Sequence, residues 1–140
     1  MSADAFIDTD VIIHFLTRDD PEKQAASAAL FEAIKDDRLT MVAPDTVIAE
    51  AVLILASPRL YDLTRGEVQA LLTPLVRLAG FKVDNKRAIL EALELYARTD
   101  LVFADALVVS SMRVADARTL YSYNSTFECV STIDRRTSVS

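Results

Sequence analysis

Short apolar runs alternate with pairs of longer, helix-patterned segments along most of the chain. The runs predict strands at residues 5–7, 39–43, 81–83 and 119–122, with a further edge strand at 130–133. Among the first four predicted strands, two predicted helices separate each strand from the next one. Parallel strands need such crossovers, and the helices then cover both faces of the sheet. The pattern therefore predicts an α/β fold built on a parallel sheet.

Local signals mark where several helices begin. Pro21 opens a long helix, since proline lacks the N–H group that would be unpaired in the first turn. Thr64 and Glu67 have the spacing of a capping box. Asn85 is a good cap for the helix that follows the third strand. Pro74 is expected to kink or split the helix that contains it.

The composition bounds the class of protein. The 140 residues fit a single domain, residues 1–140, and a hydrophobic content of 51% excludes a disordered chain. The single cysteine cannot form an internal disulfide, and neither a secretory signal nor a membrane-spanning run is visible, so a soluble cytoplasmic protein is expected. A net charge of −6 argues against a simple nucleic-acid binder with a broad basic surface. It suits a protein that gathers carboxylates in a metal site or meets a basic partner.

Three carboxylates each stand alone in an apolar stretch. Asp8 ends the first predicted strand, where the ligands of open α/β sheets bind. Glu50 is the only charge between residues 46 and 57, and Asp105 is the only charge between residues 101 and 112. The apolar surroundings predict that Glu50 is buried, and a buried acid needs a partner or a metal. The three residues are therefore candidates for one site.

Each carboxylate also has a purely structural explanation. Asp8 can cap the next helix, Glu50 can face water from the one exposed edge of its helix, and Asp105 can be stabilised by the helix dipole. Together, three carboxylates in one site would repel one another and require a cation. Oxygen ligands favour Mg²⁺ or Mn²⁺, which most often serve phosphoryl or phosphodiester chemistry. The sequence shows no His/Cys zinc set, no glycine-rich phosphate loop and no Ser–His pair, and its one histidine, His14, is interpreted as an ordinary helix residue.

Five segments of the chain follow the order of motifs in a known family. They are Phe6-Ile-Asp-Thr-Asp-Val-Ile-Ile with Asp19-Asp20-Pro21, Val47-Ile-Ala-Glu-Ala-Val-Leu, Tyr61-Asp-Leu-Thr-Arg-Gly-Glu-Val, Phe103-Ala-Asp-Ala-Leu-Val-Val, and Leu120-Tyr-Ser-Tyr-Asn with Phe127. These segments resemble those of PIN domains. The resemblance covers nearly the whole chain, and the three acidic motifs occur in the family's order.

The resemblance implies a three-layer α/β/α sandwich around a mainly parallel sheet of four to five strands. It implies an endoribonuclease that depends on Mg²⁺ or Mn²⁺, most like the VapC-type toxins of toxin–antitoxin pairs. Such toxins commonly dimerise and are inhibited by a cognate antitoxin protein. On this interpretation Asp8, Glu50 and Asp105 are the catalytic residues, which bind the metal and help activate the attacking water. Thr9 and Ser122 would form hydrogen bonds near the metal, the water or the substrate phosphate.

The chain departs from the family pattern at two positions. Asn124 stands where many members carry an acid, so one metal, or a weak second one, is expected. Val102 also replaces a frequent acid, and Asp100 is the nearest residue that can substitute for it. The basic residues expected to form an RNA-binding rim are Arg59, Arg65, Arg135 and Arg136.

Two other functions remain open from the sequence. Asp8-Thr-Asp10 after an apolar strand resembles the signature of haloacid-dehalogenase-like phosphatases, in which Asp8 would be the nucleophile and Asp10 an acid/base group. No Gly-Thr pair follows Asp10, and no suitably placed lysine is evident. The other alternative is a PIN-like domain that binds RNA or protein without cleaving it, and Asn124 is the feature that favours it.

Overall fold

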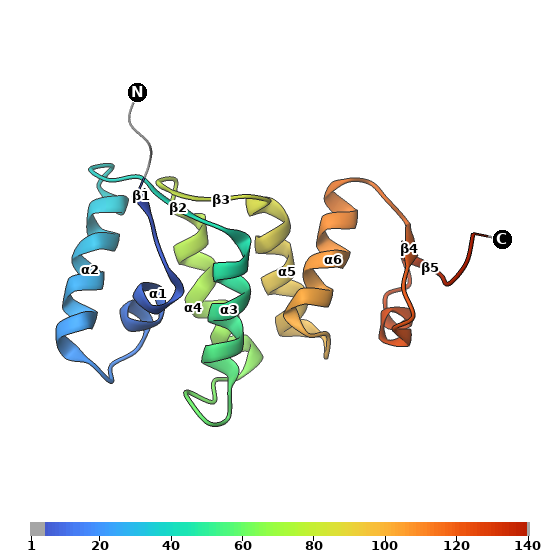
Figure 1. Ribbon diagram of the computed structural model, residues 1–140, viewed down its shortest axis with the longest axis horizontal. Helices are drawn as coiled ribbons and strands as arrows, with labels where there is room; N and C mark the ends of the chain where they lie inside the picture. Colours follow the sequence, from blue (N-terminus) through green and yellow to red (C-terminus); the bar gives the residue numbers. More distant parts are fainter. Residues whose placement is uncertain (1–4, 140) are drawn as a thin grey trace.

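The computed structural model describes residues 5–139, whose elements follow the predicted strand–helix–helix order (Figure 1). The strands are β1 (Ala5–Phe6), β2 (Met41–Ala43), β3 (Phe81–Val83), β4 (Thr119–Tyr121) and β5 (Asp134–Arg136). The helices are α1 (Thr9–Leu16), α2 (Pro21–Lys35), α3 (Asp45–Ala56), α4 (Arg65–Arg77), α5 (Lys86–Arg98) and α6 (Phe103–Val114), with a 3-10 helix η1 (Ser125–Cys129).

The predicted edge strand at residues 130–133 is wrong, because the last strand, β5, begins at Asp134. Residues 130–133 form a turn in which the N–H of Ile133 donates to the carbonyl of Val130 at 3.2 Å. Val130 and Phe127 are both buried, so this turn is apolar because it packs against the core. The apolar residues Val130 and Ile133, which suggested an edge strand, therefore belong to a turn anchored on the core.

Helix starts agree closely with the local signals. Asp20 caps α2 through its side chain, with Pro21 in the first turn. Thr64 and Glu67 form both hydrogen bonds of a capping box at the start of α4. Pro74 does not split α4, which runs through it, so the expected break is not found. Asn85 precedes α5 with a left-handed backbone (φ 60°) and makes no side-chain cap bond.

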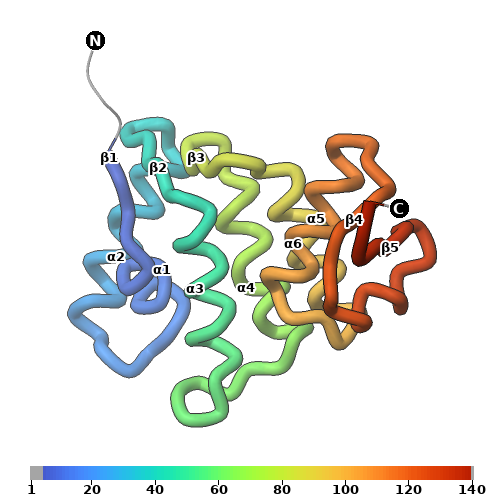
Figure 2. The backbone as a smooth tube through the Cα atoms, turned by 45° about the vertical axis from the view of Figure 1, so that its right-hand side comes forward, coloured from blue at the N-terminus to red at the C-terminus, as the bar shows by residue number. Residues whose placement is uncertain are grey.

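The fold class is α/β, as predicted, but the five parallel strands form two sheets in place of one. β1, β2 and β3 form a parallel sheet in that order, and β4 pairs with β5 in a separate parallel sheet. The first strand therefore lies at an edge of its sheet. The cause is the course of α5 and α6, which run away from the first sheet and place β4 at the opposite end of the molecule from β1 (Figures 1 and 2).

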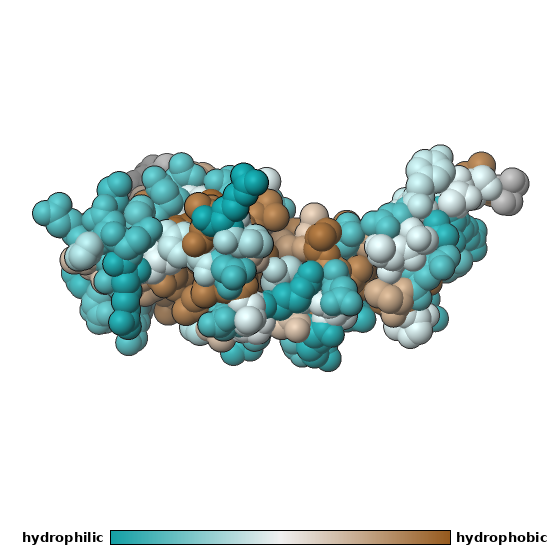
Figure 3. Space-filling view, turned by 90° about the horizontal axis from the view of Figure 1, so that it is seen from below, coloured by the Kyte–Doolittle hydropathy of each residue, from teal (hydrophilic) through white to brown (hydrophobic). Residues whose placement is uncertain are grey.

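The hydrophobic core joins the three-stranded sheet to helices α1 to α6, and α6 contributes Phe103, Ala106 and Val109 to it. Its largest fully buried side chains include Ile48 of α3, Leu72 of α4, Phe81 of β3 and Leu93 of α5. The α5–α6 and α4–α5 pairs have the most extensive helix packing in the chain. Between α3 and α6 the surface is hollowed, and hydrophobic side chains line the hollow (Figure 3).

No helix within residues 5–139 combines the length and the apolar character that crossing a membrane requires.

Candidate functional site

An open pocket of about 390 Å³ lies at the carboxyl end of β1. The N–H of Ile7 donates to the carbonyl of Val42 at 3.0 Å, which continues the pairing of β1 with β2 to the edge of the pocket. Asp8 and Thr9 line the pocket where the chain turns into α1, and Glu50 lines it from α3. The pocket therefore joins the first two predicted acidic residues, in the region where parallel sheets place their ligands.

Asp8 has a structural role as well as its place in the pocket. Its Oδ1 accepts a hydrogen bond from the backbone N–H of Thr9 at 2.7 Å, and Asp8 is the N-cap residue of α1. Asp8 is exposed and lines the pocket, so its capping bond leaves it accessible to solvent. The capping explanation and the functional explanation of Asp8 are thus compatible.

Glu50 is exposed, so the prediction that it is buried is wrong. It shares the solvent-facing edge of α3 with Thr46 and with Leu53, which is 70% exposed. Residues four and three positions apart lie on one helix face, so Glu50 points outward while Val47, Ile48 and Ala51 face the core. The apolar sequence around Glu50 reflects the wide buried face of α3, and the acid still reaches the pocket of Asp8.

Asp105 is in a different place. It lies half-buried in the first turn of α6, and its Oδ2 accepts a hydrogen bond from Nδ2 of Asn124 at 3.2 Å. Oδ1 of Asn124 accepts from the backbone N–H and the hydroxyl of Thr126, and the N–H of Asn124 donates to Oγ of Ser122 at 3.0 Å. The predicted residues Asp105, Ser122 and Asn124 therefore form a second group, around α6 and the end of β4.

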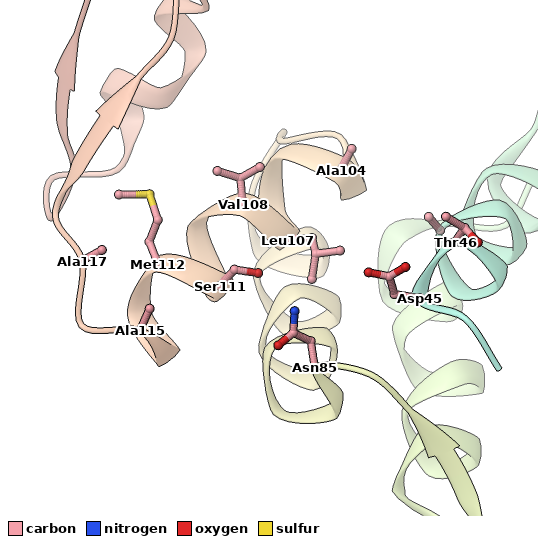
Figure 4. Close-up of a pocket in the computed structure, with 11 residues that line it drawn as sticks. Asp45, Thr46, Asn85, Ala104, Leu107, Val108, Ser111, Met112, Ala115 and Ala117 are labelled. Carbon is pink, nitrogen blue, oxygen red and sulfur yellow. The ribbon is translucent and has the colours of Figure 1, made fainter. Parts of the chain in front are cut away.

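The chain as folded does not bring these two groups together. Asp105 does not line the pocket of Asp8 and Glu50, and in residues 5–139 no group of three or more His, Cys, Asp or Glu side chains could hold a metal ion. A cleft of about 540 Å³ lies between α3 and α6 (Figure 4). The residues of one chain therefore do not fit the three-carboxylate metal site that the sequence predicts.

Thr9 combines burial with an unused hydroxyl. Its side chain is 3% exposed, yet Oγ1 has no hydrogen-bond partner in the part of the chain that the structure describes. A buried hydroxyl without a partner is unfavourable by about 1–3 kcal/mol in proteins, so it calls for an explanation. Thr9 belongs to the lining of the pocket that Asp8 and Glu50 share.

Among the pocket residues that were not predicted as site residues, Tyr61 and His14 carry polar ring side chains. Tyr61 lines the pocket and donates a 2.6 Å hydrogen bond to Oδ2 of Asp19, which lowers the pKa of Asp19 and raises the pKa of Tyr61. His14 also lines the pocket, and its Nδ1 lies 3.7 Å from Oδ1 of Asp19. His14 follows Asp10 by four residues and therefore shares its helix face, which was a usable sequence signal. Tyr61 reaches the pocket only through long-range folding.

The four predicted RNA-binding arginines differ in their surroundings. Arg65 donates to the carbonyls of Tyr96, Thr99 and Leu101 at 2.7–2.9 Å, and its guanidinium stacks on the Tyr96 ring at 4.3 Å. It also donates at 3.3 Å to the carbonyl of Asp100, the predicted supporting residue. Arg65 thus ties α4 to the end of α5.

The other three arginines lie at the surface or near β5. Arg135 pairs with Glu128 at 2.7 Å and donates to the carbonyl of Ser122, and Arg136 pairs with Asp134 at 2.8 Å. Arg59 is exposed in the loop after α3, close in sequence to the pocket residues Leu60 and Tyr61.

Parallel strands joined by helix pairs, with acids at the end of β1 and at the start of α6, define an α/β protein with an acidic candidate site. The family model described as PIN domain matches residues 5–132, and the chain belongs to this family. PIN domains have a nuclease-like fold, which supports hydrolysis of nucleic acid as the class of activity. No curated protein matches the sequence.

Proposed function

We propose that this protein is an endoribonuclease that hydrolyses RNA phosphodiester bonds and acts as the toxin of a toxin–antitoxin pair. The observation that carries the proposal is the pocket at the end of β1, where Asp8 and Glu50 meet beside the unpartnered hydroxyl of Thr9. Carboxylates can orient a water molecule and accept its proton, and a buried hydroxyl can hold a phosphate oxygen. The PIN family membership supports the same class of reaction.

Dependence on Mg²⁺ or Mn²⁺ belongs to the proposal. The predicted ligands Asp8, Glu50 and Asp105 offer only oxygen atoms, which these cations prefer. One chain presents Asp8 and Glu50 in one pocket and Asp105 elsewhere, so the proposal requires an arrangement that adds Asp105 to the pocket.

The proposed partners are RNA, a second copy of the chain and an antitoxin protein. Support for a protein partner comes from Leu53 and Leu60, two large apolar side chains that are 70% and 62% exposed beside the pocket. Exposed apolar groups next to a polar site are typical of surfaces that another protein covers. An antitoxin bound there would block RNA from the pocket.

The second candidate function is a non-catalytic PIN domain that binds RNA or protein. The observation that favours it is the hydrogen bond between Asp105 and Asn124, which keeps the third acid away from Asp8. The phosphatase interpretation loses its support, because the family match is to PIN domains.

The test is cleavage of a mixed RNA pool by the partner-free protein with Mg²⁺, with Mn²⁺ and with excess chelator. The control variant is Asp8→Asn, since asparagine caps helices as well as aspartate does and should preserve α1. Discrete products that require metal, and that fall by at least about 100-fold in the variant, would support the proposal. RNA binding without cleavage in either metal would favour the non-catalytic domain.

A further inference from the structure

We infer that two copies of this chain exchange their C-terminal strands, with β4 of each copy pairing with β1 of the other. Each complete site then contains Asp8, Thr9 and Glu50 of one copy and Asp105 and Asn124 of the other. This inference rests on the proposed nuclease function for the meaning of the site.

The first observation is the open edge of β1. Among the described residues β1 pairs only with β2, and Phe6 in this strand is 69% exposed. Parallel sheets normally have both faces and most edges covered. An exposed strand edge with a large aromatic side chain is a surface that readily accepts another strand.

The second observation is the matching edge at the other end of the molecule. β4 pairs only with β5 within residues 5–139, and Tyr121 of β4 is 54% exposed. A sheet of two short parallel strands is smaller than the most common size of about four to six strands, and it leaves one edge of β4 open. The chain therefore presents two open edges, one on each side of the divided acidic site.

The third observation explains why the second edge comes from another copy. β1 and β4–β5 lie at opposite ends of the molecule in both views (Figures 1 and 2). Helix α6 packs more extensively on α5 than on any other helix, and the cleft of about 540 Å³ separates it from α3 (Figure 4). Closing β4 onto β1 of the same chain would disrupt the α5–α6 or the α4–α5 packing. Two copies related by a twofold axis can pair both edges reciprocally and keep that packing.

Pairing of β4 with the partner's β1 would also complete the site. Asp105 is hydrogen-bonded to Asn124, which lies three residues after β4. Wherever β4 pairs, these two residues therefore lie next to its carboxyl end. Asp8 stands two residues after β1. Strands that pair side by side place residues just beyond their ends close together, which adds the third carboxylate to the pocket of Asp8 and Glu50.

The test uses heterodimers of two inactive variants, Asp8→Asn and Asp105→Asn, co-expressed with different tags and purified by both tags in turn. In an exchanged dimer one of the two sites receives both wild-type residues, so about half of wild-type RNA cleavage per dimer is expected. If each chain forms its own site, every site carries one defect and the heterodimer is inactive. The matched control is Asp8→Asn with Glu50→Gln, which remains inactive under exchange because both residues come from the same copy.

A second measurement does not depend on cleavage. Phe6→Cys and Tyr121→Cys are placed on separate chains, in a background where the exposed Cys129 is replaced by serine, and are joined by a short bifunctional thiol reagent. Exchange predicts a covalent dimer only when both chains are present. A monomeric product from a single chain carrying both cysteines, without dimer, would overturn the inference.

Active wild-type protein without heterodimer rescue would also overturn the inference and leave the nuclease proposal intact. Inactive wild-type protein would reject the nuclease proposal, and the cross-link would then decide the exchange.

Discussion

The hydroxyl of Tyr61 donates a 2.6 Å hydrogen bond to Oδ2 of Asp19, a residue 42 positions earlier in the chain. This bond ties the loop after α3 to the turn between α1 and α2, at the rim of the pocket that holds Asp8 and Glu50. It lowers the pKa of Asp19 and raises the pKa of Tyr61. The contribution of this hydrogen bond to stability therefore depends on pH.

Replacing Tyr61 with phenylalanine should make the thermal stability less dependent on pH at both extremes. Because the folded-state pKa of Asp19 is lowered, its contribution is present above the unfolded value of about 3.9 and is lost as the pH falls through the folded value. Because the folded-state pKa of Tyr61 is raised, its contribution is present below about 10 and is lost as the pH rises through the folded value. Melting temperatures of wild type and Tyr61→Phe between pH 2 and 11 measure this. Parallel curves would show that the bond does not form in solution.

Arg65→Ala should destabilise the protein by an amount on the order of 3 kcal/mol, because Arg65 donates to three carbonyls at the end of α5 and beyond. Arg65→Lys should recover only part of the loss, since lysine lacks the planar fork that reaches several carbonyls. The matched control is Arg59→Ala, which should leave stability unchanged and weaken RNA binding. Denaturant unfolding and RNA-binding titrations of the three variants separate the two roles. If Arg65→Ala keeps its stability but binds RNA more weakly, Arg65 has the RNA-binding role that the sequence predicts and not a structural one.

Thr9→Val should keep the fold and lower the activity. Valine has nearly the same shape and removes a buried hydroxyl that has no partner in the described chain, so stability should be unchanged or higher by about 1 kcal/mol. Cleavage should fall by about 10-fold if the hydroxyl holds substrate or water, the value of one hydrogen bond of about 1.4 kcal/mol. Ser110→Ala is the control, since Ser110 is equally buried with an unpartnered hydroxyl and does not line the pocket. Full activity in Thr9→Val would assign Thr9 to the core alone.

Asn124→Asp should destabilise the metal-free protein by about 1 kcal/mol, because a carboxylate in place of the amide donor would face Asp105. Added Mn²⁺ should reverse this loss, since a divalent cation relieves repulsion between carboxylates. The double variant Asp105→Asn/Asn124→Asp restores one donor and one acceptor, so it should regain stability without metal. Melting temperatures of the wild type and the two variants, with Mn²⁺ and with chelator, test this. If Mn²⁺ does not change the melting temperature of Asn124→Asp, no cation binds near Asp105.

The order of the elements and the start of most helices were predictable, because the signals act within a few residues. Asp20 with Pro21 and Thr64 with Glu67 satisfy backbone N–H groups one turn away, so they specify a helix start in almost any tertiary setting. Glu50 shows where such reasoning ends. Its apolar neighbours described the buried face of α3 correctly, yet the direction of the acid depended on which edge of the helix the other elements leave uncovered.

The sequence by itself determined an α/β chain with PIN-type acidic motifs at the end of β1, on α3 and on α6. Only the tertiary structure decided that β1 is an edge strand, that β4 and β5 form a second sheet, and that Asp105 contacts Asn124 away from Asp8. Only it decided that Arg65 ties α4 to α5 and that Tyr61 meets Asp19. The physical reason is the sequence range of the interactions. Helix caps and hydrophobic periodicity depend on neighbours along the chain, whereas strand order and long-range side-chain contacts depend on how α5 and α6 pack against distant segments.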